Sequence, residues 1–317
     1  MSWVRFLAVR LAVAVAVLAG LSALVFAATD VLPGDAVGVI AGPDATAAER
    51  DQIRSSLHLD GSALERYRSW MSAVVHGDLG HAYIGGGPVT SIIAQRLPAS
   101  ALLAGLTIPL VIVCALTAGL IAGTRAGGRA DRVLSTLSLI AVGIPEFLVA
   151  TLMMLAFSRW LGWLPAVSLV PLGESVASNP SVMVLPVLSM AVVGTAVAFR
   201  LLRGSIIDVC ASPYIEAAKL AGIGDMRRAL RHVLPNSVGP FISAVAIISA
   251  GLVGGAVVVE TLFGYPGIGR ELQRAVATRD VPVVQGVTLL LSALSLGILL
   301  LGDIAARLLD PASRRAS

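Results

Sequence analysis

The sequence predicts an all-α membrane protein with six transmembrane helices. Of its 317 residues, 56% are hydrophobic and only 13% are charged, whereas a soluble domain carries about 25% charged residues. Charged residues are absent mainly from six long apolar stretches. A helix needs about 20 apolar residues to cross a bilayer. Because unpaired backbone groups are costly in hydrocarbon, these stretches are expected to be helical. The predicted spans are residues 7–29, 99–123, 134–158, 182–199, 238–259 and 283–304.

The first apolar stretch has some features of a secretory signal peptide. Arg5 and Arg10 give it a charged start, and residues 26–28 (Phe-Ala-Ala) resemble a weak cleavage site. However, its apolar run is longer than the roughly 7–15 residues of a signal core, and five further spans follow. We therefore expect an uncleaved first transmembrane helix.

The segment 30–98 after the first span carries signals for short amphipathic helices. Thr46 with Glu49, and Ser62 with Glu65, both match the capping-box pattern, in which the hydroxyl and the carboxylate each satisfy a free N–H at a helix start. Apolar residues then recur at helical spacing after Ser62 until Gly77. A Gly-Gly-Gly-Pro turn at 85–88 precedes another short apolar helix, 89–97. These helices would either cap the bundle or form an extracytoplasmic docking platform.

Positive residues predict the orientation of the spans. With the N-terminus inside, the inner segments carry fourteen Lys or Arg residues and the two short outer loops carry four, which fits the positive-inside rule. Membrane topology therefore explains the net charge of +4, and no nucleic-acid partner is expected. The predicted division is a first transmembrane helix, 1–29, an extracytoplasmic segment, 30–98, a five-helix core, 99–307, and a tail, 308–317. Both termini would be cytoplasmic.

The inner loop 203–235 is punctuated as helix, glycine turn and helix. Ser212 is a good N-cap residue and Pro213 suits the first helical turn. Gly222 fits the left-handed position after a helix end, and Asp225 would cap a second helix, 226–233. The first helix presents a small-residue face beside several arginines. Such a stiff loop suits a docking surface for a moving partner, although an ordinary structured loop would look the same.

The loop also resembles the coupling loop of ABC-importer permeases. It contains Glu216-Ala217-Ala218, Gly222 and Leu234-Pro235 at the spacing of that family. His232 stands where the general pattern has isoleucine, and His232, Leu234 and Asn236 together are similar to the dipeptide/oligopeptide/nickel permease subfamily. Further matches occur in order along the chain at residues 32–35, 77–80, 96–99, 161–165, 260–269, 279–280 and 282–286.

This resemblance implies a type I ABC-importer permease fold and the role of first permease subunit. The implied partners are a second homologous permease, two ATPase subunits, an extracytoplasmic solute-binding protein and a peptide substrate, in a bacterial inner membrane. The implied ATPase-coupling residues are Glu216, Ala217, Ala218, Gly222, Asp225, Arg227 and Arg228.

The chain is not expected to hydrolyse ATP itself. A P-loop needs a Gly-Lys pair followed by Ser or Thr, and the one lysine in the sequence, Lys219, follows Ala218. We therefore expect no catalytic, cofactor-binding or metal-binding residues in this chain, with ATP and Mg²⁺ held by the ATPase subunits. No protease or esterase motif supports an intramembrane enzyme.

Charged residues at membrane depth are candidates for the translocation pathway. Glu146 follows Pro145 in the third span and would line the pathway, pair with Arg200 or face the partner permease. Glu260 is placed near the outer interface. The cargo stays open between peptides, nickel, glutathione-like compounds and other small solutes. A secondary transporter without an ATPase is the alternative from another class.

Overall fold

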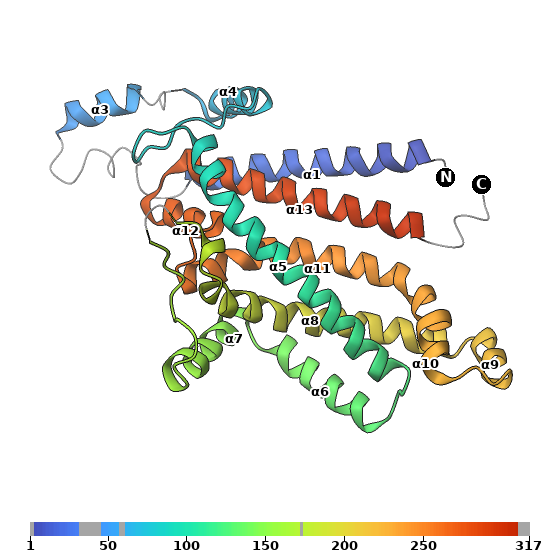
Figure 1. The fold of residues 1–317 in the computed structure, drawn as a ribbon. Coiled ribbons are helices and arrows are strands. Elements are labelled where there is room, and N and C mark those ends of the chain that lie inside the picture. Colours follow the sequence, from blue (N-terminus) through green and yellow to red (C-terminus); the bar gives the residue numbers. More distant parts are fainter. Residues whose placement is uncertain (1–2, 32–45, 57–60, 172–173, 310–317) are drawn as a thin grey trace. The chain divides into compact units, whose positions relative to one another are not determined.

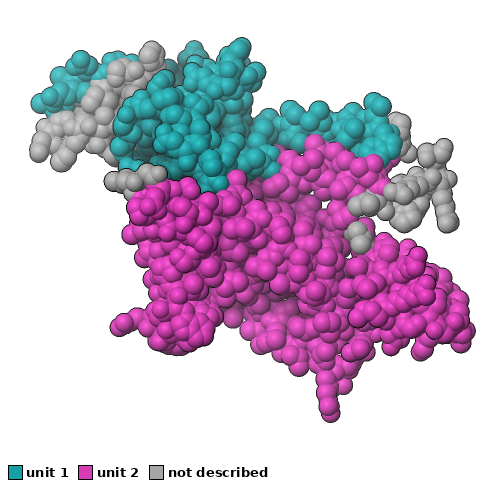
Figure 2. Space-filling view, in the orientation of Figure 1, with its two compact units in different colours: residues 1–100, 266–294 teal, residues 101–265, 295–317 magenta. Residues whose placement is uncertain are grey.

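The computed structural model describes residues 3–31, 46–56, 61–171 and 174–309. The predicted motif at residues 32–35 and nearly all of the tail 308–317 lie outside this part. Almost every described residue outside turns is helical (Figure 1). The chain forms two compact units, residues 1–100 with 266–294 and residues 101–265 with 295–317 (Figure 2). The fold class predicted from the sequence, an all-α membrane protein, is confirmed.

In the first unit, a short helix is fastened to the first apolar helix. The apolar helix is α1 (Trp3–Val31), and the short helices α3 (Ala47–Ser56) and α4 (Ala63–Val75) follow it. The hydroxyls of Ser22 and Tyr67 share a hydrogen bond of 3.0 Å, and Phe26 stacks on Trp70 with ring centroids 6.1 Å apart. These contacts place α4 against the C-terminal half of α1.

Both predicted capping boxes are present. The backbone N–H of Ser62 donates to Glu65 at 3.0 Å, and the N–H of Glu65 donates back to the Ser62 hydroxyl at 3.4 Å. Thr46 and Glu49 make the same reciprocal pair at 2.8 and 3.3 Å. These hydrogen bonds lower the pKa of both glutamates. The largest contribution comes from the backbone N–H of Thr46 for Glu49 and from the hydroxyl of Ser62 for Glu65. The predicted helix starts are therefore confirmed.

One predicted boundary in this unit is wrong. The predicted short helix 89–97 and the second span are a single helix, α5 (Val89–Gly123), of 35 residues. The glycine turn before it is confirmed, with Gly85 and Gly86 at positive φ. Pro98 lies inside this helix and does not end it, although a proline removes one N–H donor from the helical hydrogen bonds. Membrane helices tolerate such prolines.

The core of the first unit joins the start of α5 to the last two helices. These are α12 (Ile268–Thr278) and α13 (Val281–Leu309). Asp280, in the turn between them, is buried and accepts the backbone N–H groups of Tyr83 and Ile84 at 3.0 and 3.1 Å. The buried apolar residues of this core are Ala82, Val89, Ile93, Ile268, Ala275, Val283 and Val287.

The second unit is built around α8 (Ser181–Cys210). This helix packs on α11 (Leu234–Phe263), α6 (Arg129–Gly143) and α7 (Glu146–Met153). Glycines allow the closest approaches, because a Cβ at Gly302 would lie 2.1 Å from the Cβ of Ala246, and one at Gly123 would lie 2.5 Å from Ile206. The small residues therefore set how near α11 and α8 come to their neighbours.

The third predicted span, 134–158, is not one straight helix. The chain forms α6, then α7 and a π-helical segment, Met154–Trp160, and the two parts meet at an angle of 105°. Ile144 is extended, with φ −96° and ψ 128°, as expected for a residue whose following proline disfavours the helical conformation. The described residues thus contain five helices able to cross a membrane, or six if the bent pair is one span.

Candidate functional site

The loop that carried the sequence motif is a stiff pair of short helices. It consists of α9 (Pro213–Leu220), a turn at Gly222, and α10 (Asp225–Arg228), at the far end of α8 in Figure 1. Gly222 has φ +74°, so the predicted left-handed glycine is confirmed. Ser212 and Pro213 occupy the predicted N-cap and first-turn positions. However, the Ser212 hydroxyl donates to the carbonyl of Val209 and does not accept an N–H from the start of the helix.

The second half of the loop differs from the prediction. Gly224, not Asp225, is the N-cap residue, and Asp225 is the first residue of α10. The helix does not end near Val233, because a π-helical segment, Ala229–Val233, leads directly into α11. The helix continues past Arg228 because no glycine lies between Arg228 and Leu234 to end it. The loop is therefore anchored on one side by α8 and continues on the other side into α11.

Internal hydrogen bonds hold the glycine turn. The N–H of Ile223 donates to the carbonyl of Ala218 at 3.2 Å, and the N–H of Gly222 donates to Lys219 at 3.0 Å. The Arg228 guanidinium donates to the Ile223 carbonyl at 3.1 Å and also to the Asp225 carboxylate. Two of the predicted coupling residues, Asp225 and Arg228, thus shape the loop itself.

The loop exposes an apolar surface that the sequence motif did not reveal. Glu216, Ala217 and Arg227 are exposed, but Leu220 and Met226 are more notable because 84% and 73% of their surfaces are exposed. Exposed large apolar residues mark interaction surfaces when they gather. The missed signal was two apolar residues flanking the glycine turn of a polar loop.

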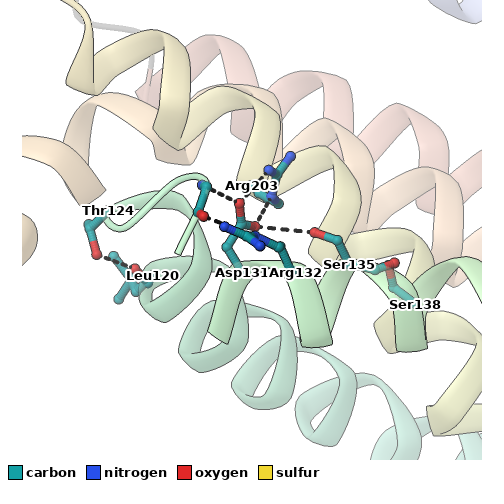
Figure 3. A network of polar contacts seen from close by, with 8 residues as sticks. Leu120, Thr124, Asp131, Arg132, Ser135, Ser138 and Arg203 are labelled. Carbon is teal, nitrogen blue, oxygen red and sulfur yellow. Dashed lines mark hydrogen bonds and ion pairs between the residues drawn. The ribbon is translucent and has the colours of Figure 1, made fainter. Parts of the chain in front are cut away.

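A buried ion pair lies within the second unit and joins α6 to α8 (Figure 3). Asp131 on α6 is 2% exposed and makes two hydrogen bonds with the Arg203 guanidinium of α8, one through Nη2 at 2.7 Å and one through Nε. The same carboxylate accepts the N–H of Gly127 at 2.8 Å and the Ser135 hydroxyl at 3.2 Å. The network fastens α6 to α8. From the sequence, Arg203 was only one of the positive residues that predict the orientation of the spans, and Asp131 was not singled out.

Glu146, one of the two predicted pathway residues, is at the bend of the broken span. It is the first residue of α7, directly after Pro145. Its Oε1 is buried and has no hydrogen-bond partner in the part of the chain that the structure describes. Its carboxylate lies against Gly255 of α11, where an added Cβ would come within 2.5 Å of Oε2. The bend and a glycine together make room for this acidic side chain.

Glu260, the other predicted pathway residue, is fully buried near the end of α11. Gly264 then ends the helix in the left-handed conformation, and the N–H of Tyr265 donates to the Glu260 carbonyl at 2.8 Å. Burial, and secondarily the Glu260 carboxylate, raises the pKa of the Tyr265 hydroxyl. The structure does not bring Glu260 together with Glu146.

Comparison with known proteins fits this arrangement. Residues 115–315 match the family described as binding-protein-dependent transport system inner membrane component, and residues 3–104 match the N-terminal part of the same kind of protein. The chain belongs to this family. It is thus the integral inner membrane component, a permease subunit, of an ABC importer.

Individual relatives of this permease match over nearly their whole length. A probable peptide ABC transporter permease of Sinorhizobium fredii is 33% identical, covering 96% of this chain and 97% of that protein. The glutathione transport system permease protein GsiC of Escherichia coli is 32% identical, covering 92% and 93%.

Solved structures show the same fold. The MetNI methionine ABC transporter in an inward-facing conformation aligns with a TM-score of 0.59 at 18% identity, covering 70% of this permease and 97% of that chain. An amino acid ABC transporter crystallised with histidines aligns with a TM-score of 0.52 at 16% identity, covering 71% and 94%. The predicted ABC-importer permease family and fold are confirmed.

Proposed function

We propose that this permease imports di- or oligopeptides and forms the translocation pathway with a second, homologous permease subunit. The observation that carries the cargo proposal is the near full-length match to a relative named as a probable peptide permease, at 33% identity over 96% of this chain. The glutathione permease, at 32% identity, supports a glutathione-like cargo as the second candidate. Glutathione is itself a tripeptide with a γ-linked first residue, so both candidates carry an amine, amide bonds and a C-terminal carboxylate.

The second part of the proposal is that α9, the Gly222 turn and α10 form the docking site for a separate ATPase subunit. The turn is fixed by its own hydrogen bonds, so the loop would move as a rigid element and transmit a displacement by the ATPase to the helices it joins. Leu220 and Met226 offer apolar surface, and Ala217 and Ala218 allow close approach. Glu216 and Arg227 provide charges at the rim of this surface.

This assignment places both chain termini and the loop in the cytoplasm. Two ATPase subunits would hold ATP and Mg²⁺, because the one lysine of this chain, Lys219, is not preceded by glycine and forms no P-loop. An extracytoplasmic binding protein would deliver the solute. Closure of the ATPases on ATP would then draw the docking loops together and change which side of the bundle is open.

Within the pathway, we assign Glu146 to contact with the cargo. A half-buried carboxylate at a helix break is a costly feature in a membrane, and its Oε1 has no hydrogen-bond partner among the described residues. A cationic group such as a peptide amine would complete it. Glu260, which is fully buried, is assigned a place in the packing at the end of α11, next to the pathway.

The docking assignment is tested by replacing Gly222 with aspartate in the complete transporter. Gly222 has φ +74°, a conformation that side chains rarely adopt, so the turn should distort. The expected result is normal membrane insertion with reduced ATPase association and reduced transport. Gly224→Ala is the matched control, because Gly224 has an ordinary φ of −60° and an added Cβ meets nothing within 4 Å. Normal transport by the Gly222→Asp variant would contradict the assignment.

The cargo is tested by uptake in a deletion strain. Labelled dipeptide should enter cells that carry the intact permease and not cells that lack it. Competition with unlabelled glutathione distinguishes the two candidates. Uptake of glutathione without uptake of dipeptide would replace the first candidate by the second, and uptake of neither would overturn the proposed cargo class.

A further inference from the structure

The first compact unit contains a basic cavity that plays no part in the docking site. It has a volume of about 420 Å³ and is lined by the α12 side chains Arg270, Glu271 and Arg274, and by Arg96 of α5. Pro266, Gly267 and Ala277 provide small or apolar parts of its wall. A concave site of 300 to 1,000 Å³, roughly, is typical of a small-molecule site, so this cavity has the volume for a small solute.

The cavity has an excess of positive charge. Two of its arginines, Arg96 and Arg274, share one carboxylate, that of Glu271, whose side chain is only 15% exposed. Glu271 lies 3.5 Å from Arg96 Nε and 3.6 Å from Arg274 Nη1. Both separations exceed the roughly 2.7–2.9 Å of a charge-assisted hydrogen bond. Glu271 therefore holds two guanidinium groups near each other, and its single negative charge cannot balance both of them.

A second hollow of about 210 Å³ has several lining residues in common with the first. Arg96, Glu271 and Arg274 line both hollows, while Ile84, Ile92 and Val283 add apolar wall to the second. Asp280 also borders this hollow, but its carboxylate oxygens accept the N–H groups of Tyr83 and Ile84. Polar and charged residues thus make up more than half of the lining of the second hollow.

We propose that this cavity binds the C-terminal carboxylate of a short peptide. A guanidinium matches a carboxylate in plane and in spacing, which a point charge does not. The partly buried positions of Arg96 and Glu271 favour a small solute that enters the cavity over an acidic residue on the surface of a large partner. This inference rests on the proposed peptide cargo.

The test compares a free dipeptide with its C-terminal amide. Alanyl-phenylalanine and alanyl-phenylalanine amide, both labelled, are bound to the complete transporter in lipid nanodiscs without the binding protein, whose own selectivity would otherwise contribute. The free acid should bind about tenfold more tightly than the amide, because a charge-assisted hydrogen bond is lost. Arg96→Gln and Arg274→Gln should each weaken binding of the acid about tenfold and leave the amide unchanged.

Controls separate this result from general damage and from failure of the cargo proposal. Arg68→Gln removes an exposed arginine of α4 that does not line the cavity, and it should change neither affinity. Arg274→Lys keeps the charge and should retain part of the acid–amide difference. Equal affinity of the unaltered transporter for acid and amide would overturn the inference, even where cells import dipeptide normally.

Two other outcomes would also overturn it. If the glutamine variants weaken both probes equally, the arginines support the fold and do not recognise a carboxylate. If the variants leave the acid–amide ratio intact but weaken docking of the binding protein, an acidic residue of that protein occupies the cavity. Absence of any dipeptide uptake by intact cells would instead remove the cargo proposal on which the inference rests.

Discussion

The carboxylate of Glu146 occupies the space that a side chain at Gly255 would need. A Cβ added at Gly255 would lie 2.5 Å from Glu146 Oε2 and 3.1 Å from its Cδ. Both residues are in the second compact unit, one at the bend after Pro145 and one in the last third of α11. The position of the Glu146 side chain therefore depends on residue 255 of α11 being a glycine.

Replacement of Gly255 by alanine should displace Glu146. Overpacking of this kind costs about 1–3 kcal/mol, so we expect a lower melting temperature in detergent and reduced transport. Gly254→Ala is the control, because a Cβ there meets nothing within 4 Å. Adding Glu146→Ala to Gly255→Ala should restore the thermal stability but not the transport. A Gly255→Ala variant with unchanged stability and transport would contradict the described packing.

Removal of Arg203 should destabilise the second unit more than neutralisation of Asp131 does. Arg203→Gln leaves a carboxylate that is 2% exposed without its cationic partner, at a cost of about 1.5–3 kcal/mol for a charged hydrogen-bonded group. Asp131→Asn keeps some of the hydrogen bonds with Gly127 and Ser135. Thermal unfolding of both single variants and the double variant measures the coupling. Strictly additive effects would show that the pair contributes no interaction energy.

Loss of the apolar surface on the docking loop should weaken ATPase binding without weakening the fold. In the Leu220→Ser, Met226→Ser double variant, thermal stability should change by no more than about 0.5 kcal/mol, since both side chains are exposed. Burying one such side chain contributes about 1.5–3 kcal/mol, so the dissociation constant of the ATPase subunit should rise at least about tenfold. Leu64→Ser, at an exposed leucine of α4, should leave it unchanged. Equal ATPase affinity of the double variant and the intact permease would exclude this surface from the contact.

Asp280 should be needed for the order of the loop 81–88. Asp280→Ala removes the acceptor of the N–H groups of Tyr83 and Ile84, and each partly buried donor left unpaired costs about 1–3 kcal/mol. Hydrogen exchange at these two amides should therefore accelerate strongly in the variant. Asp78→Ala, which affects only the local bond to Gly80, is the control and should leave Tyr83 and Ile84 protected.

Much of the architecture could be predicted from local chemistry. The capping boxes at Thr46 and Ser62, the glycine turn at Gly222 and the apolar spans depend on residues close together in the sequence, so their patterns are visible there. Pro145 disfavours a helical Ile144, but Pro98 and Pro186 lie inside unbroken helices, so a proline in a continuous apolar run does not by itself predict a bend. Hydropathy reports composition and not the path of the backbone.

What could not be predicted depends on residues far apart in the chain. The ion pair between Asp131 and Arg203 joins positions 72 residues apart, and the fit of Glu146 against Gly255 joins two different helices. Taken alone, Arg203 is explained as a positive residue on the inner side of the membrane, and Gly255 as one of many glycines in a membrane helix. Likewise, the basic cavity appears only when Arg96 of α5 is placed beside α12.

The 105° bend between α6 and α7 also decides which side of the membrane the later part of the chain reaches. The 15 residues of α6 rise about 22 Å, less than the roughly 30 Å of a bilayer core, so neither half crosses alone. Five crossings would have odd parity and leave the two chain ends on opposite faces, whereas six have even parity and return them to the same face. A docking loop reaches the face of the N-terminus only if the two bent halves pass through the bilayer together as one crossing.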